Sequence, residues 1–143
     1  RTYGLDLSHK HVPEMQLHAG LSLAPIFAPA VVKAFRGMMV EVPLPISVMP
    51  GSDSPEEMRA CLMEHYVGSP VVKVHTDMAP SELLILNTQE PSDRLELYVM
   101  GSPNGDQVRL MAMLDNLGKG ASGAAVQNLN IMAGLDEVSG LRL

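Results

Sequence analysis

The sequence has few of the residues on which several common classes of protein depend. Its 143 residues include one cysteine, two phenylalanines and no tryptophan. A single cysteine excludes an intrachain disulfide framework. Ten Lys and Arg residues against sixteen Asp and Glu give a formal net charge of −6, which argues against a nucleic-acid partner because phosphate binding needs a basic face. No apolar run approaches the length of a bilayer span and no secretory signal pattern opens the chain, so we expect a soluble protein.

The remaining composition is that of a globular domain. Hydrophobic residues make up 46% and charged residues 18%, which is too apolar for disorder. A compact domain of this length buries roughly 70% of its unfolded surface, so one conventional core is expected. Eleven methionines replace the scarce aromatic residues as flexible core-filling side chains. With no linker, repeat or low-complexity tract, residues 1–143 are predicted to form one domain.

The clearest predicted helix follows Ser54. The Ser54 hydroxyl can cap the free N–H groups, Pro55 suits the first helical position and Glu57 completes a capping box. The apolar face of this helix consists of Met58, Cys61, Leu62 and His65. On that face we expect Cys61 to be a small buried hydrophobe and not a reactive thiol, and His65 to be a core or boundary residue.

Two shorter helices and five strands complete the predicted elements. The helices cover about residues 13–18 and 120–133, and the strands cover residues 38–46, 71–76, 83–86, 95–100 and 107–114. In the first strand Pro43 and Pro45 confine the strand to an edge or shorten its ladder. The Asn-Gly pair at residues 104–105 predicts a hairpin between the last two strands. The predicted fold class is therefore α+β, a mixed, largely antiparallel sheet with helices packed on one face.

Two segments near the ends of the chain carry a family resemblance. Residues 8–15 read Ser-His-Lys-His-Val-Pro-Glu-Met, and residues 115–137 run from Asp-Asn-Leu-Gly-Lys-Gly through a helix-like stretch to Leu-Asp-Glu. Their order and spacing resemble the second domain of the N-acetyl-gamma-glutamyl-phosphate reductases, with further agreement at residues 27–29 and 36–37. The resemblance implies a C-terminal domain of the glyceraldehyde-3-phosphate-dehydrogenase-like type, whose sheet commonly supplies a subunit interface. It also implies that the NADP-binding Rossmann domain and the nucleophilic cysteine lie outside this chain.

The resemblance assigns acid–base chemistry to the histidine segment. In such reductases a cysteine thiolate attacks the acyl phosphate, and a neutral histidine accepts the thiol proton and later donates one to the developing oxyanion. His9 and His11 are the candidates, and His11 is preferred because it lies nearest the predicted helix start. Pro13 disfavours helical geometry at Val12, so an extended segment would bring both imidazoles to one side. Glu14 is a candidate to orient an imidazole or contact the substrate, although a Glu there more commonly complements the helix dipole.

Further candidates concern the substrate and the cofactor. Arg36 is the candidate to clamp a phosphate or carboxylate of the substrate, because its planar fork of donors matches both groups. Without the resemblance, a solvated Arg36 paired with Glu41 would be preferred. The resemblance places Asn116, Gly120 and Ala121 near NADP, whereas small residues at the start of a buried helix need no ligand. No metal site is expected, since the histidines lack a recognisable ligand spacing.

These observations together predict one part of an enzyme. The favoured function is the substrate-binding and dimerisation domain of an NADP-dependent acyl-phosphate reductase that forms the semialdehyde of arginine biosynthesis. The alternatives are a related reductase of the lysine or aspartate-semialdehyde pathways and a non-enzymatic interaction domain. The resemblance places both the nucleophilic cysteine and the dinucleotide-binding domain outside this chain, so we expect the chain to be inactive alone. The expected partners are an acyl phosphate, the Rossmann domain and further copies in a homodimer or homotetramer, and the expected location is cytoplasmic, or mitochondrial for a fungal source.

Overall fold

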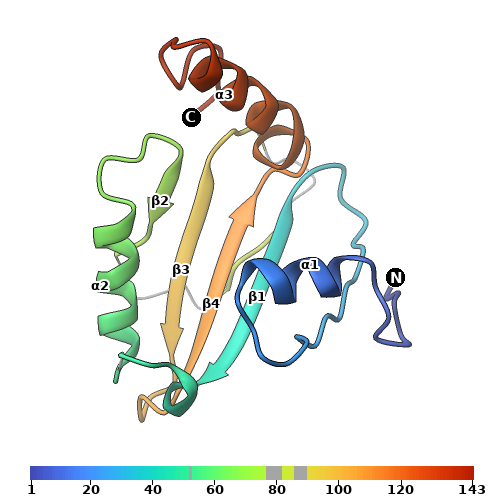
Figure 1. The fold of residues 1–143 in the computed structure, drawn as a ribbon, viewed down its shortest axis with the longest axis vertical. Coiled ribbons are helices and arrows are strands. Elements are labelled where there is room, and N and C mark those ends of the chain that lie inside the picture. Colours follow the sequence, from blue (N-terminus) through green and yellow to red (C-terminus); the bar gives the residue numbers. More distant parts are fainter. Residues whose placement is uncertain (52, 77–81, 86–89) are drawn as a thin grey trace. The chain divides into compact units, whose positions relative to one another are not determined.

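The sheet of this protein belongs to the second of two structural units. The computed structural model describes residues 1–51, 53–76, 82–85 and 90–143, and it divides into units of residues 1–33 and 34–143. The strand order is β1-β4-β3-β2, formed by β1 (Met38–Pro45), β2 (Val72–Val74), β3 (Leu95–Gly101) and β4 (Gln107–Leu114) (Figure 1). β4 is antiparallel to both of its neighbours, and β2 is parallel to β3. The predicted mixed, largely antiparallel α+β architecture is confirmed.

The hairpin and the edge strand follow from local sequence signals. β3 and β4 form the predicted hairpin, and Gly105 takes the φ of 74° that the second position of its Asn-Gly turn requires. β1 lies at the edge of the sheet, and its ladder runs without shortening to Pro45 opposite Gln107. Alternate N–H groups of an edge strand point away from its single neighbour, so Pro43 and Pro45, two residues apart, are tolerated there.

The helix α2 (Pro55–His65) begins where the sequence predicts. The Ser54 hydroxyl accepts a hydrogen bond from the Glu57 N–H at 3.1 Å. The Glu57 carboxylate accepts one from the Asp53 N–H at 2.7 Å, so the reciprocal bond of the capping box reaches one residue further back than expected. The two bonds satisfy N–H groups that would otherwise lack an acceptor at the start of the helix.

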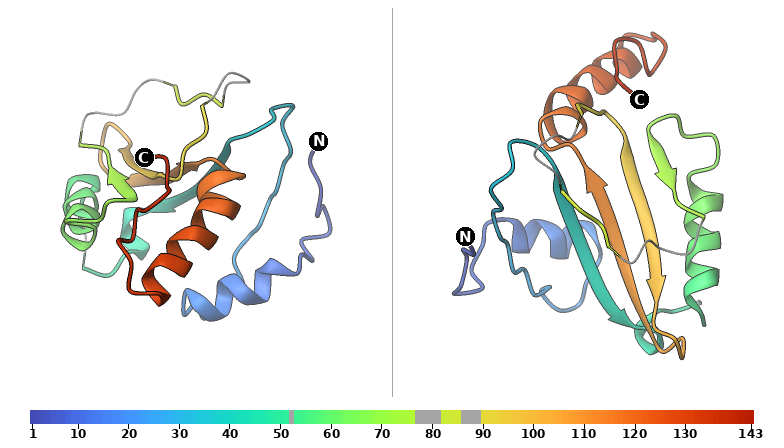
Figure 2. Two further views of the ribbon diagram at one scale, coloured as in Figure 1. Left: turned by 90° about the horizontal axis from the view of Figure 1, so that it is seen from above. Right: turned by 180° about the vertical axis from the view of Figure 1, so that it is seen from behind.

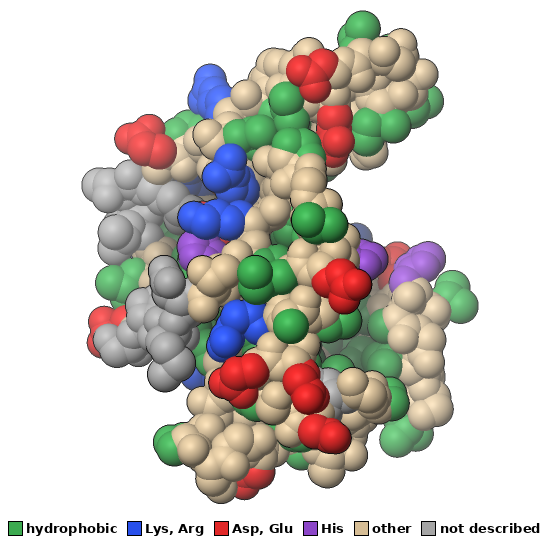
Figure 3. All heavy atoms as spheres, turned by 90° about the vertical axis from the view of Figure 1, so that its left-hand side faces the viewer, with side chains coloured by type: hydrophobic (Ala, Val, Ile, Leu, Met, Phe, Trp, Pro, Cys, Tyr) green, Lys and Arg blue, Asp and Glu red, His purple; other side chains and the backbone are tan. Residues whose placement is uncertain are grey.

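α2 packs on the sheet beside β2 and β3 (Figures 1 and 2). Met58 is 5% exposed and forms a small core with Val99 and Val108. The partly buried side chains around this core are Leu44, Ile46, Met49, Leu62 and Leu110. The predicted burial of Cys61 and His65 is wrong, since both are exposed; the sheet contacts a narrower stripe of the helix than the pattern suggests. On the side where α2 lies, charged side chains of both signs are interspersed with hydrophobic ones (Figure 3).

The chain leaves β4 through a π-helical turn. This turn covers Gly118–Ser122, and α3 (Gly123–Met132) continues from it. The predicted helix at residues 120–133 is thereby confirmed with an earlier start. Figures 1 and 2 show α3 beyond the end of the sheet and not across its face. The sheet face predicted to carry helices is covered by α2 within this unit.

Two glycines let the start of α3 press against the segment that leads into β3. A Cβ on Gly118 would strike the carbonyl oxygen of Ser92, and one on Gly123 would strike the Asp93 carboxylate. The chain end returns to the same place, because the Asp93 N–H donates to the Arg142 carbonyl at 2.7 Å and the Arg142 N–H donates to Asp93 Oδ2 at 2.8 Å. Residues 92–93 therefore join β3, the start of α3 and the C-terminal segment.

Two predicted strands differ from the observed ones, and a third ends early. The strand expected at residues 71–76 is reduced to β2, with three residues. Of the strand expected at residues 83–86, residues 83–85 adopt no strand and Leu86 lies outside the described residues. A short 3-10 helix, Ile46–Val48, takes over at the end of β1.

The first unit contains α1 (His11–His18) and a chain reversal. Thr2 pairs with Ala30 in an isolated antiparallel bridge. α1 begins two residues before the predicted start, so the expectation of an extended His11 and Val12 is wrong. Pro13 falls in the first turn, where its missing N–H has no intrahelical acceptor to lose. Within the described residues, no helix has the length and apolar character needed to cross a membrane.

Candidate functional site

The two candidate histidines lie side by side in the first unit. Their ring centroids are 4.8 Å apart, with an angle of 63° between the ring planes. Phe27 packs near both rings, with centroid distances of 5.0 Å to His9 and 6.5 Å to His11, and Tyr3 lies 5.8 Å from His9. His9 Nδ1 accepts a hydrogen bond from the backbone N–H of His11 at 3.3 Å. The structure therefore brings both imidazoles into one aromatic cluster, although by a turn into a helix and not by an extended strand.

An unusual backbone turn leads the chain into this cluster. Leu7 has a φ of 57°, in the left-handed region that a side chain with a Cβ rarely adopts. The Asp6 carboxylate accepts a hydrogen bond from the Ser8 N–H at 3.3 Å and so closes the turn locally. Such conformations are retained mainly where the surrounding structure fixes them, often at functional sites. The turn sets the direction from which His9 enters the cluster, where it is half-buried while His11 is exposed.

Glu14 lies in the first turn of α1 and is exposed. A carboxylate at this position complements the positive end of the helix dipole, as the residue pattern alone favours. Its assignment as a group that orients an imidazole or contacts the substrate stays a prediction.

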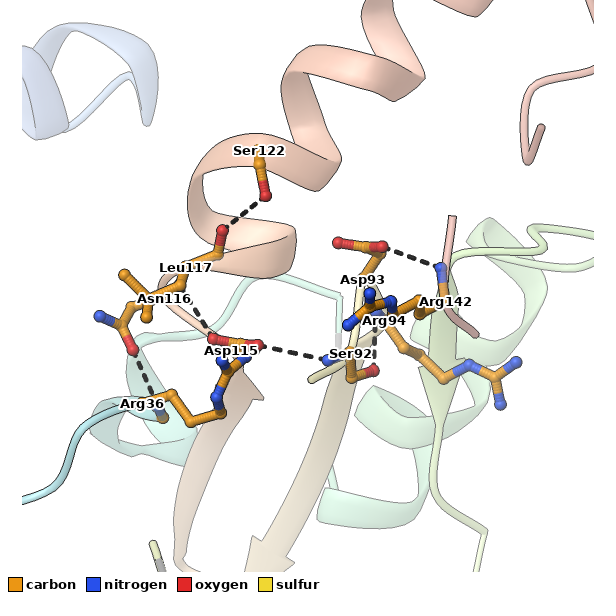
Figure 4. Close-up of polar contacts among 10 residues, drawn as sticks. Arg36, Ser92, Asp93, Arg94, Asp115, Asn116, Leu117, Ser122 and Arg142 are labelled. Carbon is orange, nitrogen blue, oxygen red and sulfur yellow. Dashed lines mark hydrogen bonds and ion pairs between the residues drawn. The ribbon is translucent and has the colours of Figure 1, made fainter. Parts of the chain in front are cut away.

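Arg36, the candidate substrate clamp, is bound to a buried carboxylate. Its Nη1 donates to Asp115 Oδ2 at 2.5 Å (Figure 4), and the side chains are 19% and 0% exposed respectively. The alternative pairing of Arg36 with Glu41 is wrong, because the antiparallel ladder brings Arg109 beside Glu41, with its Nε 2.8 Å from the carboxylate. The Arg36 guanidinium also lies 5.4 Å from the centroid of the Phe35 ring.

Asp115 is held in its ionised form by several donors. Its Oδ1 accepts from the Leu117 N–H at 2.9 Å, and its Oδ2 accepts from the Ser92 N–H at 3.3 Å as well as from Arg36. Burial alone would raise the pKa of Asp115, but the hydrogen bonds from Leu117, Ser92 and Arg36 outweigh burial and hold the pKa below its usual value. The carboxylate is therefore charged at neutral pH and fixes the guanidinium of Arg36 in place.

The candidate cofactor residues lie next to this ion pair. Asn116 Oδ1 accepts from the Gly37 N–H at 2.7 Å, and its amide nitrogen points away from that bond (Figure 4). The Gly120 N–H donates to the Asp115 carbonyl at 2.9 Å, and a Cβ on Gly120 would press on the end of β4 at 3.2 Å. Close packing thus accounts for the glycine, while Gly120 and Ala121 remain exposed and leave room for a ligand.

A cavity of about 330 Å³ opens beside Arg36 within the second unit. Its charged and hydroxyl-bearing lining residues are Arg36, Ser92, Asp93, Asp115, Ser122 and Arg142. The two arginines and two aspartates balance in formal charge, and both carboxylates already accept hydrogen bonds from the protein. The donors that could meet an anionic group are the arginine side chains and the hydroxyl of Ser92, whose oxygen accepts from the Arg94 N–H.

Sequence reasoning missed the residues that support Arg36. Asp115 entered the sequence pattern only as the first letter of a glycine-rich segment, yet it is 1% exposed and joins β4, Arg36 and Ser92. The one local signal is the residue type, because an Asp side chain commonly accepts from the N–H two residues on, as Asp115 accepts from Leu117. Ser92 and Asp93 have no comparable signal, since their contacts come from α3 and the chain end.

A second polar cluster consists of Glu96 and Tyr98 on β3 and of His75, which directly follows β2. His75 is half-buried and stacks on Tyr98, with ring centroids 4.1 Å apart. The Tyr98 hydroxyl donates to Glu96 at 3.1 Å, and burial together with the negative charge of Glu96 raises the pKa of Tyr98 to about 12. Among the described residues, no group of three or more His, Cys, Asp or Glu side chains is placed to hold a metal ion.

The class of this α+β domain is given by a comparison with known protein families. Residues 1–116 match the family described as semialdehyde dehydrogenase, dimerisation domain, and the chain belongs to this family.

Individual relatives narrow the comparison further. The N-acetyl-gamma-glutamyl-phosphate reductases of Brucella ovis and Brucella suis biovar 1 are each 48% identical to this chain over 134 residues. These residues cover 92% of the chain and 43% of each relative. The chain thus spans less than half the length of the reductases that it matches.

Proposed function

We propose that this chain is the substrate-binding and dimerisation part of an NADP-dependent N-acetyl-gamma-glutamyl-phosphate reductase, which converts an acyl phosphate to a semialdehyde in arginine biosynthesis. The observation that carries the proposal is the 48% identity over 92% of the chain to reductases of that name. A related reductase for aspartyl or longer acyl phosphates is the alternative within the same family, because the family description names semialdehyde dehydrogenases in general. The bacterial relatives favour a cytoplasmic location.

The acid–base part of the reaction falls to the histidine cluster. A cysteine thiolate, contributed by chain outside these residues, attacks the acyl carbon and phosphate leaves. His11 is the preferred group to accept the thiol proton and to return a proton to the developing oxyanion, because its ring is exposed at the first residue of α1. NADPH, when bound, supplies the hydride that reduces the acyl group.

Arg36 is the proposed anchor for a phosphate or carboxylate of the substrate. Asp115 holds Nη1, so Nη2 and Nε are the nitrogens proposed for a substrate oxyanion. The buried carboxylate removes rotamer freedom from the guanidinium before substrate arrives, which reduces the entropy lost on binding. Asn116, through its amide nitrogen, and the exposed residues Gly120 and Ala121 are the proposed contacts of NADP on this domain.

The proposed homo-oligomer forms through the sheet. Met38, Val40 and Val42 lie at alternate positions of β1, on one face, and are 41%, 46% and 43% exposed. An apolar edge strand of this kind is stabilised by covering it with a second copy. We expect Val42→Asp to shift the mass in solution, measured by light scattering, from an oligomer toward the monomer, whereas Glu41→Gln on the opposite face leaves it unchanged.

The experiment that tests the function starts from the native protein in its source. Mass measurement and sequencing of the whole chain should find a two-domain subunit with a nucleotide-binding turn and a cysteine before Arg1. Purified full-length protein should then reduce NADP in the presence of phosphate and N-acetylglutamate semialdehyde, and the chain of residues 1–143 alone should not. Turnover with aspartate semialdehyde but not with the acetylated substrate would overturn the specific assignment, and no turnover with either would overturn the enzyme proposal.

A further inference from the structure

His9 and His11 differ in the atoms that the protein already uses. His9 Nδ1 accepts the His11 N–H at 3.3 Å, and the His9 carbonyl accepts the Val12 N–H at 2.9 Å. A ring nitrogen that accepts a hydrogen bond carries no proton, so the proton of neutral His9 lies on Nε2. The His9 ring is also half-buried and packs near Tyr3 and Phe27. One nitrogen and much of the surface of this imidazole are therefore engaged within the protein.

The bond from His11 to His9 serves the start of α1. His11 is the first residue of α1, and its N–H is one of the groups for which a helix provides no acceptor. Lys10 occupies the N-cap position without a side-chain cap bond in the described structure, and an ammonium group has no lone pair with which to make one. His9 thus takes the place of the Ser, Asp or Asn that usually accepts from the first turn.

We propose that His9 is a positioning residue for His11 and not the acid–base group. This inference rests on the proposed function and deepens it by giving separate roles to two residues that the sequence offers together as candidates. The hydrogen bond from the His11 N–H to His9 Nδ1, here called the cap bond, fixes the backbone of His11. The His9 ring, whose centroid lies 4.8 Å from that of His11, restricts the orientation of the His11 imidazole. A proton gained at His9 Nδ1 would abolish the cap bond, whereas a proton gained by the His11 ring leaves that bond in place.

The tautomer can be measured on the chain itself, without activity. Two-bond nitrogen–proton correlation spectra at neutral pH should show His9 as the Nε2-protonated form alone. His18, exposed at the end of the same helix, is the internal control and should show the tautomer mixture of a free histidine. A mixture at His9 equal to that at His18 would overturn the capping role.

Two substitutions separate the nitrogens of His9. In His9→Asn the side-chain oxygen can occupy the place of Nδ1 and keep the cap bond, whereas in His9→Gln the amide reaches the place of Nε2 and the bond is lost. We expect amide hydrogen exchange at His11 to be unchanged in His9→Asn and about fivefold faster in His9→Gln, the factor that corresponds to the loss of a typical cap. Protection kept by Gln and lost by Asn would contradict the assignment.

Kinetics of the full-length reductase test the consequence for His11. The histidine limb of the pH profile of kcat/KM should survive in His9→Asn, with kcat within about threefold of the parent, and should disappear in His11→Asn. A limb that is lost with His9 and kept without His11 would reverse the two roles. If the parent enzyme reduces no acyl phosphate, the proposed function fails together with the catalytic part of this inference, while the spectra still decide whether His9 caps α1.

Discussion

Replacing Asp115 by Asn removes the negative charge that pairs with Arg36 in the second unit. The carboxylate is fully buried and accepts from Arg36 Nη1 and from the Ser92 and Leu117 N–H groups. The asparagine amide keeps one acceptor oxygen. Its NH₂ group replaces the other oxygen, so the protein donor that bound there loses its acceptor and faces a second donor. Arg36, 19% exposed, is left with an uncompensated charge.

The structure sets the size of the expected effect. Breaking a buried pair by neutralising one partner costs roughly 3–5 kcal/mol, and the remaining exposure of Arg36 places this case near the lower end, at about 3 kcal/mol. For a chain of this length that corresponds to a fall in Tm of roughly 10 °C. The matched control is Glu41→Gln, which breaks the Arg109 pair, where the arginine is 58% exposed, and should cost less than about 1 kcal/mol.

Urea unfolding followed by circular dichroism measures both free energies. The pH dependence has a defined sign, because the pKa of Asp115 lies below its ordinary value of 3.8 in the folded protein. Its contribution to stability is complete above that ordinary value and is lost as the pH falls through the lowered one. The difference between parent and Asp115→Asn should therefore be constant near neutrality and shrink in acid. A difference below about 1 kcal/mol at pH 7, equal to that of Glu41→Gln, would refute the reasoning.

Three further predictions follow from single contacts. Gly123→Ala should lower the free energy of unfolding by more than about 2 kcal/mol, because the new Cβ would strike Asp93; a smaller loss in urea unfolding would mean that the chain yields there. Ultraviolet titration should find one of the three tyrosines, Tyr98, ionising at about pH 12, and stability should decline between its unfolded pKa near 10 and that value; Tyr98→Phe removes the late transition, and its persistence would exclude Tyr98 as the source. Cys61 should react with a thiol reagent in the folded protein at nearly the rate of the unfolded chain, and strong protection would contradict its exposure.

Elements with local causes were predictable from the sequence. α2 starts directly after Ser54, because this cap and the following proline act within four residues. The β3–β4 hairpin forms because an Asn-Gly pair fits its turn. The family resemblance brought His9 and His11 forward as one site, and the structure places their rings in contact distance.

Features that depend on distant parts of the chain were not predictable. Cys61 is exposed because the sheet covers only part of the apolar stripe of α2, and stripe width cannot be read from spacing. Arg36 binds Asp115, 79 residues away, and not Glu41, because the strand order decides which side chains meet. At the start of α1 a local rule gave the wrong prediction. Pro13 was expected to keep Val12 out of a helix, but in the first turn of α1 its missing N–H costs no hydrogen bond and the helix begins at His11.

The π-helical turn at Gly118–Ser122 makes the direction of α3 sensitive to chain length. Each α-helical residue advances the chain by about 100°, so removing one residue from this turn would rotate every later side chain of α3 by roughly that angle about the helix axis. The side chains of Leu129 and Met132, which are 63% and 86% exposed, would then point in a different direction, although the sheet and the Arg36–Asp115 ion pair stayed in place. The length of the segment before α3 therefore determines which face of the helix is presented to a neighbour. An insertion or deletion of one residue would change that face while the sequence of α3 stayed the same.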